Sequence, residues 1–61
     1  MTFTDAQLNA ITAAARAVMP SYQGAKWGDN PQDPSTWELL HDGTATPEQI
    51  AAAVAAIAEI V

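Results

Sequence analysis

Residues 33–43 have the sequence DPSTWELLHDG and decide the fold class, because they fit either a helix or a strand. In the helical interpretation, Asp33 is the N-cap and Pro34 takes the first helical position, where a missing N–H costs nothing. Gly43 then ends the helix, since glycine readily adopts the left-handed conformation of a C-cap. Because start and stop signals stand at both ends, we expect a short helix over residues 34–42.

The alternation of side chains in the same stretch supports the second interpretation. In a strand, Trp37 and Leu39 point to one face of a sheet, and the residues on either side of Leu39 point to the other. Such a strand can pair with residues 21–27, SYQGAKW, to form a hairpin. We keep this hairpin as the alternative to the helix.

Two similar stretches flank this region and predict helices that begin in the same way. The sequences TFTDAQLNAITAAARAV and TATPEQIAAAVAAIAEI share the pattern T-x-T-x-x-Q-[LI]-x-A. Thr4 and Thr46 are the expected N-caps, and Gln7 and Gln49 follow three residues later, as in a capping box. The shared physics of helix initiation explains the similarity, so we do not infer a duplication.

The extents of these two helices follow from apolar spacing and from proline. The first is expected over residues 5–19, because Pro20 disfavours helical conformation in the residue before it. The last is expected over residues 47–60. Each carries an apolar stripe at helical spacing. The stripe residues are Leu8, Ile11, Ala15 and Val18 in the first helix, and Ile50, Val54, Ile57 and Val61 in the last.

These elements together predict an all-α fold in a single small domain, residues 1–61. The two capped helices pack through their stripes, and a loop over residues 20–33 leads to the short third helix over residues 34–42. The alternative is an α+β fold, with the two long helices and a small β-hairpin.

The size of the chain limits its stability. A chain of 61 residues buries only about 60% of the surface that its unfolded form exposes. The sequence contains no cysteine, which excludes disulfides and thiolate metal sites. Self-association or docking on another protein is the remaining means of additional stabilisation.

The charge balance excludes one class of partner. The chain has two basic residues, Arg16 and Lys26, against seven acidic ones. That is too little positive charge to bind a phosphate backbone, so we expect no nucleic-acid partner. An acidic mimic of nucleic acid is a remote alternative, because the carboxylates are scattered along the sequence and the net charge of −5 is explained by solubility.

Neither a membrane span nor a secretory signal is expected. The apolar run over residues 50–58 is shorter than the roughly 20 residues that a bilayer requires. The residues after Met1 include no basic segment of the kind that opens a signal peptide. We therefore expect a cytoplasmic protein without a membrane partner, located in the host cytoplasm or the virion if a phage encodes it.

No constellation of residues predicts catalysis, a metal or a cofactor. The single histidine, His41, has no triad partners in a recognisable motif, and a position near a helix C-terminus explains it. Asp29 and Asp33 invite a calcium interpretation, but prolines occupy positions three and six of the required loop pattern. We expect no enzyme activity and no small-molecule substrate.

The predicted last helix has almost no polar face. Most positions outside its stripe are alanine, which favours helix formation, and Glu59 is the one charged residue among its last twelve. A helix that is apolar all round is usually buried all round, and so short a chain has little material to cover it. We predict that Ala52, Ala55, Ala56 and Glu59 contact another chain.

Three aromatic residues in the middle of the chain are further candidates. Tryptophan and tyrosine are enriched at the energetically dominant positions of interfaces. Trp37 is expected in the core, because a minimal domain needs large apolar side chains inside. Trp27, in a loop rich in glycine and aspartate, is the better candidate for an exposed anchor, and Tyr22 is predicted to assist it.

The sequence thus predicts a small, non-enzymatic protein–protein interaction module that docks through its alanine-rich helix and aromatic loop. The alternative is a self-associating structural subunit, whose partner is a second copy. The acidic, alanine-rich, cysteine-free composition resembles that of small proteins encoded by bacteriophages or mobile elements, which serve as virion, assembly or host-inhibitor factors. That resemblance is one of composition and involves no motif.

Overall fold

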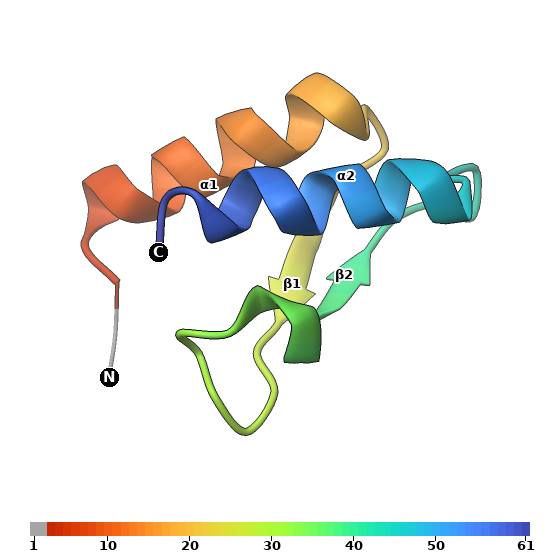
Figure 1. Ribbon diagram of the computed structural model, residues 1–61. Helices are drawn as coiled ribbons and strands as arrows, with labels where there is room; N and C mark the ends of the chain where they lie inside the picture. The colour runs from red at the N-terminus through yellow and green to blue at the C-terminus, as the bar shows by residue number, and fades with distance from the viewer. Residues whose placement is uncertain (1–2) are drawn as a thin grey trace.

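The computed structural model describes residues 3–61 and places two helices on a small antiparallel sheet (Figure 1). The elements follow in the order α1 (Asp5–Val18), β1 (Gly24–Lys26), the 3₁₀ turn η1 (Pro34–Thr36), β2 (Glu38–Leu40) and α2 (Pro47–Ala58). In Figure 1 the two helices lie side by side and run in opposite directions, and the hairpin with η1 lies below them.

The expectation of an all-α fold is wrong, because β1 and β2 pair in an antiparallel sheet. The register places Gly24 opposite Leu40, Ala25 opposite Leu39, and Lys26 opposite Glu38. The α+β alternative, with two helices and a hairpin, describes the molecule.

The predicted helix over residues 34–42 is wrong for a reason visible in burial. Asp33 caps and Pro34 begins a helical turn as expected, but the turn ends at Thr36, and Trp37 is extended. Trp37 and Leu39 are both 7% exposed, whereas Glu38 between them is exposed. Residues two apart share a face only in a strand, so the strand buries both side chains where a helix would separate them.

Both predicted capping boxes are confirmed. The backbone N–H of Gln7 donates to Thr4 Oγ1 at 3.1 Å, and the backbone N–H of Thr4 donates to Gln7 Oε1 at 2.9 Å. Thr46 and Gln49 make the same pair of bonds, at 3.0 and 3.1 Å. Each box satisfies an N–H group that the first turn of a helix leaves unpaired.

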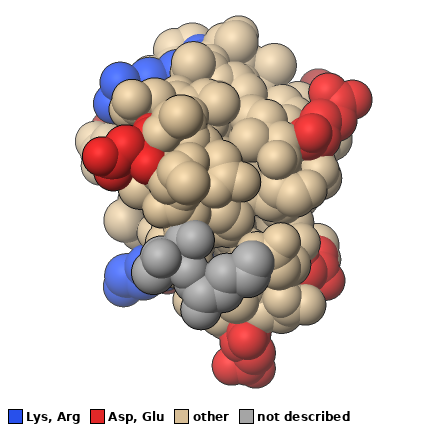
Figure 2. Space-filling model, turned by 90° about the vertical axis from the view of Figure 1, so that its left-hand side faces the viewer, with Lys and Arg blue, Asp and Glu red and all other residues tan. Residues whose placement is uncertain are grey.

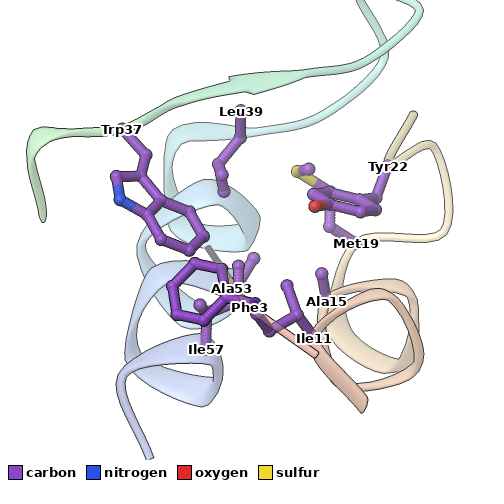
Figure 3. Packing of buried hydrophobic residues seen from close by; sticks show 9 residues of the cluster. All are labelled: Phe3, Ile11, Ala15, Met19, Tyr22, Trp37, Leu39, Ala53 and Ile57. Atoms are coloured by element: carbon purple, nitrogen blue, oxygen red, sulfur yellow. The ribbon is translucent and has the colours of Figure 1, made fainter. Parts of the chain in front are cut away.

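The core lies between the helix pair and the hairpin (Figure 3). Its buried residues are Phe3, Ile11, Ala15, Met19, Tyr22, Trp37, Leu39, Ala53 and Ile57. Met19 and Ile57 are the largest side chains that are fully buried. Ala53 of α2 is fully buried, with an exposed fraction of 0%.

The apolar stripes of the two helices are only partly buried in the core. Ile11 and Ala15 of α1 are buried, but Leu8 is 38% and Val18 37% exposed. On α2, Ile57 is buried, whereas Ile50 and Val54 are half-buried beside the core. Neither helix among residues 3–61 is long and apolar enough to cross a membrane.

Candidate interaction surface

The hairpin brings its two tryptophans to the same end of the sheet. Lys26 and Glu38 form the last pair of the ladder, so Trp27 and Trp37 leave the sheet on adjacent strands. Lys26 Nζ lies 3.9 Å from Glu38 Oε2, with both side chains about 70% exposed (72% and 69%). An ion pair this exposed contributes only about 0–1 kcal/mol, so aromatic contacts and backbone pairing define this end of the hairpin.

Three aromatic rings meet beyond the last pair of the ladder. Trp27 stands edge-to-face on Phe3, with ring centres 5.1 Å apart and planes at 88°. The ring of Trp37 lies 5.9 Å from Phe3 and 6.2 Å from Trp27. Aromatic pairs in such geometry contribute about 0.5–1.5 kcal/mol beyond their buried area, so these contacts fix the orientation of the Trp27 ring.

Trp27 is the outer member of this group. It is 40% exposed, more than any other large apolar residue that the structure describes, whereas Phe3 is 8% and Trp37 7% exposed. The ring is therefore held on one side by two buried aromatics and is open to solvent on the other.

The loop that follows Trp27 is closed by a close backbone approach. We call residues 27–36 the Trp27 loop. A Cβ atom at Gly28 would collide with the carbonyl oxygen and side chain of Thr36, so only glycine allows the two ends of the loop to meet. This contact sits directly beside the exposed tryptophan.

Short polar side chains organise the interior of the Trp27 loop. Asn30 Oδ1 accepts the N–H of Gln32 at 3.0 Å, and the carbonyl of Asn30 accepts the N–H of Asp33 at 3.0 Å. Asp33 Oδ1 accepts from the backbone N–H of Ser35 at 3.1 Å and from its hydroxyl at 2.6 Å. Thr36 Oγ1 donates to the carbonyl of Asp33 at 2.8 Å. These bonds replace the regular structure that the loop lacks.

One polar atom in the aromatic group is unsatisfied. Trp37 Nε1 is buried and has no hydrogen-bond acceptor among residues 3–61. Figure 3 shows this nitrogen on the edge of the ring remote from Leu39 and Tyr22. A buried donor without a partner costs about 1–3 kcal/mol, which this end of the molecule bears in the conformation described.

A second exposed surface lies on α2. We call it the outer face of α2, and it consists of Glu48, Ala51, Ala52, Ala55, Ala58 and Glu59, all of which are exposed. The two carboxylates stand at opposite ends, with methyl groups between them. The structure as described leaves this face uncovered by the rest of the chain.

The predicted partner-binding residues divide between these surfaces and the core. Trp27 is exposed on its loop, and Ala52, Ala55 and Glu59 belong to the outer face of α2. Ala56 lies on α2 next to that face and is half-buried. Tyr22 is 5% exposed and packs in the core, so its ring is not presented to a partner in this conformation.

The environment of Tyr22 agrees with an internal position. Burial raises the pKa of its phenol above the usual value near 10, and the nearby positive charge of Arg16 opposes that rise. Arg16 Nε also donates to the carbonyl of Tyr22 at 3.3 Å. Tyr22 thus joins the end of α1 to the start of the hairpin.

Sequence reasoning missed the closure of the Trp27 loop. The sequence predicts only a loop over residues 20–33 and does not indicate the close approach of Gly28 to Thr36. The available signal is the order Trp-Gly-Asp-Asn-Pro, in which a glycine next to an aromatic residue precedes turn-forming residues.

Charge is distributed unevenly between the elements. The segment from Lys26 to Glu38 holds one lysine and three carboxylates, those of Asp29, Asp33 and Glu38. On the end of the molecule seen in Figure 2, acidic side chains are separated from one another and do not form a continuous stripe. The Trp27 loop itself carries two of these carboxylates, on the exposed residues Asp29 and Asp33, and Asp33 Oδ1 accepts from Ser35.

The described residues form no enclosed site. Over residues 3–61 no cavity or cleft is found, and no three histidine, aspartate or glutamate side chains lie close enough to bind a metal ion. Comparison with protein-family models, curated proteins and solved structures finds no match to this chain.

Proposed function

We propose that this protein is a non-enzymatic protein–protein interaction module that binds its partner through the Trp27 loop. The observation that carries the proposal is the 40% exposure of Trp27, whose ring is held by Phe3 and Trp37. Tryptophan is enriched at positions that dominate binding energy, and a ring that is already oriented loses little entropy on binding.

The organisation of the loop supports the same proposal. Loops on a rigid scaffold are frequent binding sites, because the scaffold positions them while their sequence remains free to vary. Here the sheet, the Gly28–Thr36 closure and the hydrogen bonds of Asn30 and Asp33 hold the loop in one conformation. A preorganised exposed tryptophan suits a binding surface, because less freedom is lost when a partner binds.

Selection from a random peptide library tests this function. Peptides selected on the wild-type protein should lose at least about tenfold in affinity with Trp27→Ala, since truncation at a dominant interface position costs more than about 1.4 kcal/mol. Circular dichroism of the variant must show that it folds. Trp27→Leu, which retains apolar volume over Phe3, replaces it if Trp27→Ala unfolds. Selected peptides that bind wild type and folded variant equally would overturn the proposal.

Self-association is a second candidate, and the outer face of α2 favours it. Ala51, Ala52, Ala55 and Ala58 together expose an uncharged helical surface that nothing in the described chain covers. Sedimentation equilibrium over a wide concentration range tests this candidate, with Ala52→Glu and Ala55→Glu as variants. A wild-type protein that stays monomeric at millimolar concentration would remove it.

A further inference from the structure

We propose that the partner of the Trp27 loop is a positively charged, extended segment of another protein, whose arginine or lysine side chain stacks on the exposed ring of Trp27. This inference rests on the proposed function and specifies the chemistry of the partner. It is carried by the charge around the ring, by the ring itself and by the unpaired nitrogen of Trp37.

The charges around Trp27 favour a cation. The segment from Lys26 to Glu38 has one lysine and three carboxylates, which gives a net charge of −2. All three carboxylates are on exposed residues, and Lys26 is itself 3.9 Å from one of them, that of Glu38. Complementary charge steers association and rejects partners of the same sign, so this surface selects against acidic segments.

The ring of Trp27 provides the second half of the recognition. Tryptophan is the strongest cation–π partner among the aromatic side chains, and arginine stacks on it most often. Phe3 and Trp37 fix the ring, while its exposed part faces solvent. A guanidinium stacked on this ring would meet its π face, on a loop whose charged residues, Asp29 and Asp33, are both acidic and exposed.

The unpaired donor of Trp37 indicates the form of the segment. Trp37 is 7% exposed, and its Nε1 lacks an acceptor among residues 3–61. The ring centres of Trp27 and Trp37 are 6.2 Å apart, so this donor belongs to the same end of the molecule. Because this nitrogen is buried, a partner reaches it only if the residues that cover it rearrange. An extended peptide carries a carbonyl at every residue and would then supply the acceptor, which an isolated cation cannot.

A second copy of this chain fits this surface poorly. Each copy has a net charge of −5, so two copies repel one another. The chain has two cationic side chains. Lys26 is the last residue of β1, directly before Trp27, and Arg16 donates from Nε to the carbonyl of Tyr22. The complementary cation therefore comes from a different protein.

The test uses three synthetic decapeptides of glycine and serine that carry two arginines, two lysines or two glutamates. Binding is followed by NMR through the indole N–H resonances of Trp27 and Trp37. The arginine peptide should bind and shift both resonances, whereas the glutamate peptide should leave them in place. Trp27→Leu should weaken arginine-peptide binding about tenfold and Trp27→Phe less, because the aromatic face supplies the attraction.

A matched pair of charge variants isolates the acidic surrounding. Asp29→Asn removes one negative charge two residues after Trp27, in the loop, and Glu48→Gln removes one from the first turn of α2, outside the loop. We expect Asp29→Asn to weaken arginine-peptide binding about twofold at low salt, and Glu48→Gln to leave it unchanged.

Three results would overturn the inference: no binding of the arginine peptide at millimolar concentration, equal binding of the glutamate peptide, or equal affinity of Trp27→Leu and wild type. The peptide-library selection separates this failure from that of the proposed function. Library peptides that depend on Trp27 but lack arginine and lysine would refute the basic partner and leave the interaction module standing. Library peptides that do not depend on Trp27 would refute both.

Discussion

The outer face of α2 and the Trp27 loop are both exposed, but the chain presents them in different ways. The α2 face consists of methyl groups on a helix that alanine forms readily, and exposing a methyl group costs only about 0.8 kcal/mol. The Trp27 loop exposes the largest side chain in the sequence and holds it with ring contacts, a glycine closure and several hydrogen bonds.

Exposure alone is therefore weaker evidence for function than the contacts built around an exposed group. Scattered small apolar residues on a surface need no explanation. A tryptophan left 40% exposed forgoes burial that so small a domain could use, and its neighbours are arranged to keep it there. The loop is therefore the stronger candidate of the two surfaces.

The largest expected effect is on stability, and it distinguishes the buried face of α2 from its outer face. Ala53→Glu should unfold the protein, because Ala53 is fully buried and an unpaired buried charge costs about 3–5 kcal/mol, comparable with the whole stability of a domain this small. Ala52→Glu, one residue away on the outer face, should change stability by less than about 0.5 kcal/mol.

Urea denaturation followed by circular dichroism measures both variants. If Ala52→Glu unfolded the monomer as Ala53→Glu does, the outer face would be required for folding, and the contrast between the two surfaces would be lost. A folded Ala53→Glu would show that α2 is rotated from the position described.

A smaller loss of stability is expected when a substitution forces the Trp27 loop open. Gly28→Ala places a Cβ atom against the Thr36 carbonyl and should destabilise the protein by about 1–3 kcal/mol. Gly43→Ala is the contrast, because Gly43 has open space around it but a φ of 94°, which costs alanine about 1–2 kcal/mol through backbone strain. Urea denaturation measures both losses.

The indole N–H resonance of Trp27 distinguishes the two glycine variants. It should move in Gly28→Ala, where the loop changes shape beside the ring, and stay in place in Gly43→Ala. An unchanged resonance and unchanged stability in Gly28→Ala would show that the loop is not closed in solution, and the proposed preorganisation would fail with it.

The helices were predictable from the sequence because their signals are local. Thr4, Gln7, Thr46 and Gln49 specify helix starts through bonds within one turn, and the structure contains each of them. The helix predicted over residues 34–42 does not form, because its start signal, Asp33 and Pro34, specifies only one helical turn. Pairing with β1, which depends on residues more than ten positions away, decides its conformation beyond Thr36.

The candidate site was only partly predictable for the same reason. Trp27 stood out through its polar neighbours, and Trp37 through the need for a core. Whether Tyr22 was inside or outside depended on the strand that follows it, which the sequence did not specify. The Gly28–Thr36 closure joins residues eight positions apart in an irregular loop, where no periodic pattern exists to reveal it.

The smallest expected effect is a dependence of folding stability on pH, and it tests whether Tyr22 belongs to the core or to the surface. The folded protein holds the Tyr22 phenol proton to a higher pH than the unfolded chain, because burial raises its pKa. Stability from this group is complete below about pH 10 and is lost as pH rises through the raised folded-state value. Denaturation midpoints measured from pH 8 upward should fall accordingly.

Tyr22→Phe is the matched control, because it keeps the buried ring and removes the titrating hydroxyl. Its midpoints should fall less steeply above pH 10 than those of the wild type. Arg16→Gln should raise the pKa of Tyr22 further, since the charge of Arg16 lowers it. If wild type and Tyr22→Phe showed the same alkaline loss, the phenol would be titrating in water. Tyr22 would then join Trp27 on the interaction surface, and the boundary between core and binding loop would move by one aromatic residue.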